Sequence, residues 1–135
     1  MFFSVDYEKC NQDGLCSLEC PAKIIEMQDQ GPVAIDGAEE TCIRCGHCVA
    51  VCPEAALFLD FLNPESCLQV DDDLLLSVDH VEHFLRSRRS IRTYRQKPVP
   101  KDVLEKVLTI ASSAPTGSNR QPVKWMVIHE KDRVQ

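Results

Sequence analysis

Short apolar runs separated by turn residues dominate the first 62 residues of the chain. The runs span residues 2–5, 24–27, 33–35 and 57–61. Runs of this length, separated by turn residues, predict strands rather than helices. The tetrapeptide Asp29-Gln-Gly-Pro between the second and third runs is typical of a hairpin turn. We therefore expect a hairpin in this part, with one strand before it and a closing strand after it.

The pattern changes to helical spacing after about residue 76. Val81, Phe84 and Leu85 recur at the spacing that places them on one face of a helix. Ser77 and Asp79 are the candidate N-cap residues, because short polar side chains accept hydrogen bonds from the first free N–H groups of a helix. An amphipathic helix is therefore predicted here.

A second helix is predicted after Val99-Pro100, because proline is favoured at the first helical position. The loop that follows, 112–122, is rich in Ser, Pro, Gly and Asn. The mixed apolar pattern of residues 123–128 then predicts a strand that is buried on both faces. The apolar face of the second helix comprises Val103, Leu104, Val107, Leu108 and Ala111.

The charge distribution divides the 135 residues into two parts. Residues 1–79 contain 3 Lys/Arg and 16 Asp/Glu, which gives a net charge of −13. Residues 80–135 contain 12 Lys/Arg and 5 Asp/Glu, which gives a net charge of +7. We therefore predict one domain at 1–62, a linker at 63–78 and a second domain at 79–135. The aspartates at 71–73 are expected to be solvated, because a calcium site needs ligands that are spread more widely.

The chain shows no sign of a membrane-spanning or secretory segment. No apolar run approaches the roughly 18 residues of a membrane span. The first six residues lack the basic and apolar regions of a secretory signal. We therefore expect a cytoplasmic protein without a membrane partner.

Four cysteines lie within eleven residues and are followed by Pro53. The spacing Cys-x2-Cys-x2-Cys-x3-Cys-Pro is that of iron–sulfur sites in which three thiolates hold one cluster and the fourth holds its neighbour. A structural zinc site would more naturally combine two separated Cys-x2-Cys pairs, and disulfides need an oxidising compartment. An iron–sulfur site is therefore the favoured interpretation. The four residues are Cys42, Cys45, Cys48 and Cys52.

An earlier group of cysteines follows the same template. Cys10, Cys16 and Cys20 occupy three of the four cysteine positions, and Asp13 stands at the second. The whole group precedes the later one by 32 residues. Self-similarity at a fixed offset indicates an internal duplication, here of a small βαβ-like unit.

On these two motifs, residues 1–62 resemble the two-cluster bacterial ferredoxins. The resemblance implies an α+β fold of duplicated βαβ-like units that holds two [4Fe-4S] clusters with crossed ligation. One cluster would be bound by Cys20, Cys42, Cys45 and Cys48, and the other by Cys10, Asp13, Cys16 and Cys52.

Asp13 is a departure from the family's cysteine pattern. A carboxylate is a harder ligand than a thiolate and binds iron more weakly. Some relatives with aspartate here interconvert between three-iron and four-iron forms, so the resemblance suggests a [4Fe-4S] cluster that decays to [3Fe-4S] in air. In the alternative interpretation, Asp13 is a solvated turn residue before Gly14 and the site always holds three irons.

Two further side chains near these motifs each allow two interpretations. Cys67 is either a small buried apolar side chain or a substitute ligand at the aspartate corner. His47 either tunes the cluster potential by hydrogen bonding or simply lies at the surface.

Four arginines and a serine lie between the two predicted helices, at Arg86, Arg88, Arg89, Ser90 and Arg92. Guanidinium groups bind phosphate oxygens bidentately and keep their charge, so the cluster predicts an anion site with a phosphate ligand. The alternatives are a solvated basic helix end and a nucleic-acid contact. Nucleic acid is disfavoured, because the patch is short, has little aromatic interleaving and lies on an acidic chain.

The order of motifs after residue 80 resembles the opening of the nitroreductase family of FMN flavoproteins. Arg-Arg-Ser-Ile-Arg-Thr-Tyr is followed by Pro-Val-Pro and a helix, and then by Ser-Ala-Pro-Thr-Gly-Ser-Asn-Arg-Gln-Pro and a strand. The resemblance implies a partial nitroreductase-like α/β segment, bound FMN and a homodimer that shares its sites. By this likeness, Arg88, Arg89, Ser90 and Arg92 would hold the FMN phosphate and ribityl chain, and Pro115, Thr116, Gly117 and Asn119 would approach the flavin of the partner subunit.

Two departures accompany this second resemblance. Val123 follows the Gln-Pro pair, where the family often has tryptophan. The later strands and helices of nitroreductase domains do not occur before residue 135, so we expect either a fragment of a fused protein or a split form that needs a partner.

Together, the motifs predict an oxidoreductase. Electrons from a redox donor protein would pass through two iron–sulfur clusters to FMN, which would reduce a small oxidised organic substrate such as a nitroaromatic or a quinone. The alternatives are a ferredoxin-type electron carrier without catalytic activity, whose basic tail docks an acidic redox partner, and a nucleic-acid-associated iron–sulfur protein. The residues assign no catalytic acid, base or nucleophile.

Overall fold

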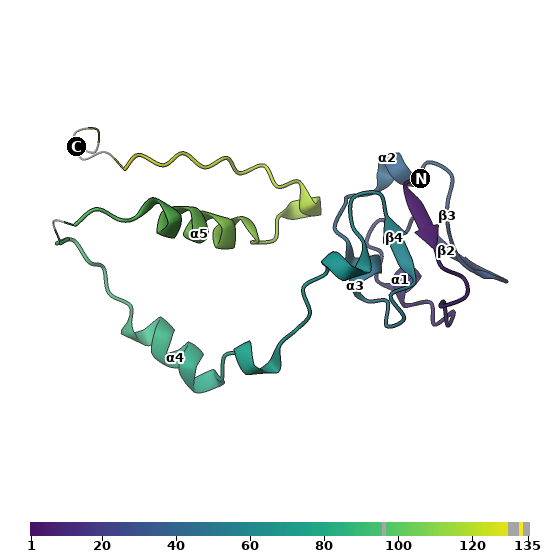
Figure 1. Ribbon diagram of the computed structural model, residues 1–135, viewed down its shortest axis with the longest axis horizontal. Coiled ribbons are helices and arrows are strands. Elements are labelled where there is room, and N and C mark those ends of the chain that lie inside the picture. The colour runs from purple at the N-terminus through teal and green to yellow at the C-terminus, as the bar shows by residue number, and fades with distance from the viewer. Residues whose placement is uncertain (96, 130–132, 134–135) are drawn as a thin grey trace. The chain divides into compact units, whose positions relative to one another are not determined.

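The computed structural model describes residues 1–95, 97–129 and 133, so the predicted second domain, 79–135, lies partly outside the described residues. The chain forms two compact units. The first comprises Met1–Gln69 together with Thr116–Arg120, and the second comprises Val70–Pro115 and Gln121–Gln135. The first unit ends within the predicted linker. Its strands and short helices are drawn in purple to teal in Figure 1.

Four short strands in the first unit form two antiparallel pairs. The strand β1 (Phe3–Val5) pairs with β4 (Leu57–Leu59). The strands β2 (Ile25–Gln28) and β3 (Gly31–Ala34) form a hairpin whose last pair, Gln28 and Gly31, encloses a two-residue turn. The predicted hairpin and its flanking strands are therefore confirmed.

Strand pairing links the two copies of the duplicated sequence. The first copy has the order β1, α1, β2, and the second has the order β3, α2, α3, β4. However, β1 of the first copy pairs with β4 of the second, and β2 pairs with β3. Both pairings are antiparallel, so the strands of one copy do not form the parallel pair of a βαβ unit. Each copy therefore completes the other, and neither forms a sheet by itself.

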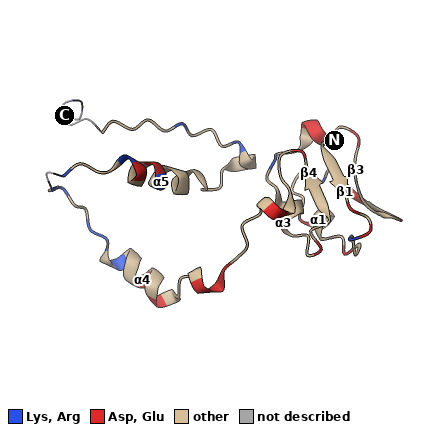
Figure 2. Cartoon of the chain, viewed as in Figure 1, with Lys and Arg blue, Asp and Glu red and all other residues tan. Residues whose placement is uncertain are grey.

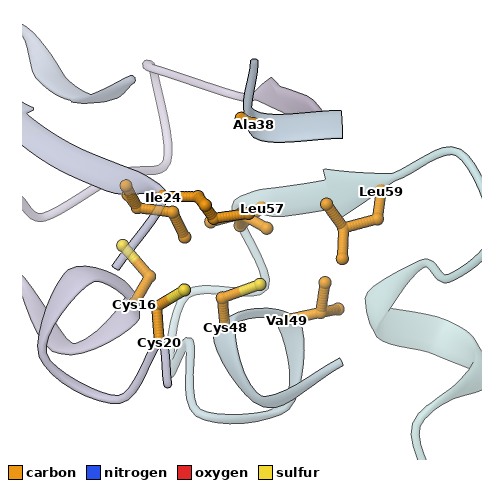
Figure 3. Close-up of a cluster of buried hydrophobic side chains, with 9 residues drawn as sticks. Cys16, Cys20, Ile24, Ala38, Cys48, Val49, Leu57 and Leu59 are labelled. Carbon is orange, nitrogen blue, oxygen red and sulfur yellow. The ribbon is translucent and has the colours of Figure 1, made fainter. Parts of the chain in front are cut away.

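Three helices of four residues lie between the strands: α1 (Leu15–Leu18), α2 (Ala38–Thr41) and α3 (His47–Ala50). Helices this short are not stable alone and depend on tertiary packing. The buried cluster in Figure 3 supplies that packing, because cysteines of α1 and α3 lie beside apolar side chains of the strands. Its members are Cys16, Cys20, Ile24, Ile25, Ala38, Cys48, Val49, Leu57 and Leu59.

The predicted linker contains two ordered turns, at Pro64–Ser66 and Asp72–Leu74. Beyond it, helix α4 (Val78–Ser87) begins at Ser77, whose side chain accepts a hydrogen bond from the His80 N–H. Of the two predicted N-cap candidates, Ser77 is thereby confirmed, whereas Asp79 lies in the first turn of the helix.

The second long helix, α5 (Lys101–Ser112), differs slightly from the prediction. Pro100 is the N-cap residue rather than the first helical residue, and its extended ψ of 145° places it just outside the helix. The loop after α5 contains a single turn of 3-10 helix at Gly117–Asn119. None of the described residues of the second unit is buried.

The predicted strand at 123–128 is wrong for the structure as described. These residues form no strand and are exposed, with Trp125 at 54% and Met126 at 87% exposure. A strand requires a hydrogen-bonded neighbour, and no described residue pairs with this segment. The apolar pattern alone therefore could not produce the element.

The charge division predicted from the sequence can be followed in Figure 2, where acidic residues dominate the N-terminal part and basic residues are frequent from α4 onward. Within the described ranges, no helix has the length and apolar character needed to cross a membrane.

Candidate iron–sulfur and flavin sites

Two cavities in the first unit are lined by cysteines. Both are small, with cavity volumes of about 10 Å³ and about 20 Å³. There is one such space for each copy of the duplicated motif. The first cavity is lined by Cys10, Asp13, Cys16 and Cys52, and the second by Cys20, Cys42, Cys45 and Cys48.

This grouping is the one that crossed ligation requires. Cys20 belongs to the first sequence motif but lines the cavity of the second, and Cys52 does the reverse. The short helices α1 and α3 pack against each other. This packing brings the last cysteine of each motif to the cavity of the other motif. The identity of the ligands themselves stays a prediction.

The cysteines surround space instead of converging on one point. Within residues 1–95, 97–129 and 133, no three His, Cys, Asp or Glu side chains come close enough to hold a single metal ion. A tetrahedral zinc site needs four ligands about 2.3 Å from one ion. The arrangement therefore fits a multi-iron cluster, whose ligands bind at separate corners, better than zinc.

Both ligand loops use the same backbone turns. Gln12 and Arg44, each two residues after the first cysteine of its motif, have positive φ angles of 59° and 53°. Gly14 and Gly46 follow with φ of 75° at each. Left-handed residues turn the chain sharply, and here they curve each loop around its cavity.

Burial changes the acidity of two thiols. Burial raises the pKa of the Cys48 thiol to about 12, and the neighbouring Cys20 thiol raises it further in the same direction. Burial likewise raises the pKa of Cys16. Both thiols are protonated at neutral pH without a metal, so binding of a cluster must displace these protons.

Backbone N–H groups point at two of the sulfurs. The Arg44 N–H donates to Cys42 Sγ at 3.3 Å, and the Ala56 N–H donates to Cys52 Sγ at 3.3 Å. Hydrogen bonds to cysteine sulfur stabilise the extra negative charge of a reduced cluster and so raise its potential. Each cavity thus has at least one such bond.

Asp13 lines the first cavity and also forms a turn just before helix α1. Its Oδ1 atom accepts a hydrogen bond from the Leu15 N–H at 2.9 Å, while its own N–H donates to Asn11 Oδ1 at 3.1 Å. The carboxylate lies close enough to Cys16 to raise the pKa of that thiol. The sequence left two alternatives for Asp13, a cluster ligand or a turn residue before Gly14. In the structure Asp13 forms the turn and also lines the cavity.

Several residues of the cavity walls were not identified from the sequence. Met27 and Pro32, from the hairpin, line the first cavity. Tyr7 covers the same hairpin, since its hydroxyl donates to the Pro32 carbonyl at 3.2 Å. Their only sequence signal was their position in apolar or turn segments, which does not indicate a cavity.

Cys67 and His47 now have defined surroundings. Cys67 is half-buried, packs against the apolar cluster and lines neither cysteine cavity. This placement agrees with the interpretation of Cys67 as a small apolar side chain and not with a substitute ligand. His47 is exposed at the start of α3, as the surface interpretation expects.

The arginine group follows the C-terminal end of α4. Arg89 Nη1 donates to the carbonyls of Arg86 at 2.7 Å and Arg88 at 2.9 Å, the arrangement of a basic residue at a helix end. Arg86 forms an ion pair with Glu82. Within the described part of the chain, no ion pair involves Arg88 or Arg92 and both are exposed.

The residues predicted to contact flavin are divided between the two units. Pro115 and the arginine group belong to the second unit, whereas Thr116, Gly117 and Asn119 belong to the first. The Asn119 side chain donates to the carbonyls of Ile43 at 3.2 Å and Arg44 at 2.8 Å. The proposed flavin contacts of both groups stay predictions.

Comparison with known families identifies both parts of the chain. Residues 3–53 match the 4Fe-4S dicluster domain, and residues 85–135 match the Nitroreductase family. Each match covers less than half of the chain, so the chain is similar to the dicluster domain in its first part and to the Nitroreductase family in its last part. Both resemblances drawn from the sequence are thereby confirmed. The two cysteine cavities fit the two clusters that the first match implies.

Curated proteins similar to this chain include several iodotyrosine deiodinases. The Danio rerio protein is 34% identical over 58 residues, which are 41% of this chain and 20% of the relative. The Haliscomenobacter hydrossis protein is 27% identical over 59 residues, 44% of this chain and 27% of the relative. Iodotyrosine deiodinase 1 of Rattus norvegicus is 38% identical over 49 residues, which are 36% of this chain and 17% of the relative. The chain thus spans about a quarter or less of these relatives' length.

Proposed function

We propose that the chain accepts single electrons from a redox donor protein, carries them through two iron–sulfur clusters and delivers them to FMN for the reduction of an oxidised organic substrate. The observation that carries this proposal is the pair of cysteine-lined cavities in a chain that also matches the Nitroreductase family. Iron–sulfur clusters are electron carriers, and a flavin supplies two-electron chemistry to organic substrates. The protein's own residues contribute the ligands, the positive charge and the shielding.

The substrate is proposed to be a small aromatic or quinone. Nitroaromatics and quinones suit a flavin that delivers electrons in pairs. The similarity to proteins named iodotyrosine deiodinase adds iodinated phenols to this class. Removing iodine from an aromatic carbon consumes two electrons and one proton, and releases iodide. In this proposal the flavin supplies both electrons, which the clusters replace from the donor protein.

The dicluster part is proposed to adopt the ferredoxin-like arrangement with crossed ligation. Its cysteine grouping and its duplicated left-handed turns support this arrangement. At the first cavity, Asp13 would complete the ligand set of a [4Fe-4S] cluster, and loss of one iron in air would leave [3Fe-4S]. The position of the Asp13 carboxylate beside Cys16 supports this assignment.

The flavin part is proposed to work as a homodimer. Arg88, Arg89, Ser90 and Arg92 would hold the phosphate and ribityl chain. Exposed guanidinium groups that have no carboxylate partner among the described residues can bind phosphate. The segment at 115–119 would approach the flavin of the partner subunit.

The test is the iron and flavin content of protein purified without oxygen. About eight iron atoms and one bound FMN per chain would support the proposal. The same sample should then reduce a nitroaromatic, a quinone or an iodinated phenol when the clusters are reduced chemically. Full iron without FMN, even after FMN is added, would instead support a ferredoxin-type electron carrier.

A further inference from the structure

The ligand loop of the second cavity is anchored on its outer side. The Arg44 guanidinium lies 3.9 Å from the centre of the Phe61 ring and 3.6 Å from Asp60 Oδ1. A cation over an aromatic face is attracted by the ring, and the adjacent carboxylate adds a charge pair. The loop from Cys42 to Cys45 is therefore held against the segment that follows β4.

This anchored loop presents two backbone carbonyls to another segment of the first unit. The left-handed conformation of Arg44, with φ of 53°, turns the chain between the two cysteines. The Asn119 amide donates to the Ile43 carbonyl at 3.2 Å and to the Arg44 carbonyl at 2.8 Å. Residues 116–120 are thus part of the same compact unit as the ligand loop, although they are more than 70 residues away in the sequence.

The Asn119 position suits this contact. Asn119 has φ of 51°, a conformation that asparagine tolerates better than most residues. Its amide offers two N–H donors, and the two carbonyls use one amide nitrogen. An isosteric carboxylate would have no donor and would face two carbonyl oxygens.

We propose that residues 116–120 form a docking loop on the ligand loop 42–45, and that the cluster bound by Cys20, Cys42, Cys45 and Cys48 is the one next to the flavin. The docking itself does not depend on the flavin, whereas the statement about the flavin rests on the proposed function. The same short segment would then touch the ligand loop on one side and approach FMN on the other.

This placement orders the electron path. The cysteines of the second cavity would hold the cluster that supplies the flavin with electrons one at a time, and residues 116–120 would keep that cluster and the flavin close together. Two such electrons, with two protons from solvent, would fully reduce the flavin, and the donor protein would restore electrons to the clusters. The first cavity, with Asp13, would then lie on the donor side.

The test measures how close residues 116–120 lie to the paramagnetic iron. Amide proton relaxation is recorded by nuclear magnetic resonance on the isotope-labelled, iron-loaded full chain, with its clusters reduced and without added FMN. Asn119→Asp and Asn119→Gly both remove the donor, and glycine also accepts the positive φ. Ser118→Ala is the matched control, because Ser118 has the same φ of 51° and lies one residue away.

The proposal predicts several-fold faster relaxation at residues 116–120 in the wild-type chain and in Ser118→Ala than in the two Asn119 variants. Retained hyperfine-shifted signals of the cysteine ligands in every variant show that the dicluster part is still folded. Equal relaxation in the wild type and Asn119→Asp would overturn the docking. FMN binding is titrated separately, so a chain that docks the loop but binds no FMN contradicts the proposed function and leaves the docking in place.

Discussion

Gly14 and Gly46 have almost identical backbone angles, with φ 75° and ψ 2° at Gly14 and φ 75° and ψ 3° at Gly46. Each immediately precedes a four-residue helix whose second residue is a cavity cysteine, Cys16 or Cys48. The duplication seen in the sequence is therefore retained in the local backbone. The surroundings of the two glycines differ, however, and this difference can be tested.

Gly46→Ala is expected to destabilise the iron-loaded protein more than Gly14→Ala. Alanine in a left-handed conformation costs about 1–2 kcal/mol at either position. At residue 46 the new Cβ would also lie 2.5 Å from Leu62 Cδ2, whereas at residue 14 the nearest atom is Met27 Cγ at 3.8 Å. The contacted atom is the end of a flexible side chain, so Leu62 must shift, and the added cost is at the low end of about 1–3 kcal/mol.

The measurement for these variants is the denaturant midpoint of cluster absorbance loss, recorded without oxygen. The double variant Gly46→Ala/Leu62→Ala should recover part of the loss, because it removes the crowding and leaves the backbone strain. Equal midpoints for Gly14→Ala and Gly46→Ala would show that Leu62 does not restrict the loop.

Asp13→Cys is expected to make the first cluster resistant to air. A thiolate binds iron more strongly than a carboxylate. On exposure to air, wild-type iron should fall from about eight to about seven atoms per chain, with a growing three-iron signal in electron paramagnetic resonance, while the variant keeps about eight. Asp29→Cys, in the hairpin turn outside both cysteine cavities, controls for the extra thiol. An equally oxygen-labile cluster in Asp13→Cys would exclude Asp13 as the weak corner.

Arg44→Ala is expected to lower stability by about 0.5–2 kcal/mol, because it removes both the ring contact and the ion pair. Arg44→Gly loses the same contacts but relieves the left-handed strain, so it should be less destabilised. Gln12 is the matched control, since it has φ of 59° without either contact. Gln12→Gly should be neutral or stabilising in the same thermal unfolding experiment, and an Arg44→Gly variant less stable than Arg44→Ala would contradict the strain argument.

Alkylation of the iron-free chain should be slowest at Cys48. Its pKa of about 12 keeps the thiol protonated, and only the thiolate reacts. The raised pKa means that the reactive fraction increases as the pH rises toward 12. Mass spectrometry after a short iodoacetamide pulse should show at least tenfold less modification at Cys48 than at Cys45 near neutral pH. In strong denaturant the difference should disappear, and persistence of the difference there would exclude burial as its cause.

Arg88→Ala and Arg92→Ala are each expected to weaken FMN binding about tenfold, or about 1.4 kcal/mol, through the loss of a charge-assisted hydrogen bond to phosphate. Arg95→Ala removes the same charge from the same segment but lies outside the predicted contacts. Fluorescence titration with FMN measures the dissociation constant of each variant, and Arg95→Ala should bind FMN as the wild type does. Similar weakening in all three variants would indicate general charge attraction instead of a defined phosphate site.

Local sequence signals predicted the local elements well. The hairpin at Asp29 and the Ser77 cap depend on residues that are close together in the chain. The apolar runs at β1 and β4 also predicted strands, although these two strands pair over a long sequence distance. The segment 123–128 was not predicted correctly, because a strand exists only beside another strand. An apolar pattern indicates where a strand can form and does not supply its neighbour.

Contacts between distant residues were invisible in the sequence. Nothing in the chain indicated that Arg44 would stack on Phe61, or that Leu62 would close over Gly46. The contact of Asn119 with the ligand loop joins segments more than 70 residues apart. Such pairings depend on how the elements pack, and a single sequence contains no direct measure of packing.

The sequence by itself determined the number and spacing of the thiols, the duplication, the division of charge and the two family resemblances. These properties depend on residue identity and on short-range spacing. The family resemblance implied which cysteines belong together, and the lining of the two cavities agrees with it. The tertiary structure alone decided how deeply Cys48 is buried. The physical reason is that burial and long-range approach arise from the antiparallel pairing of the two copies, which brings Cys20 beside the second motif and Cys52 beside the first.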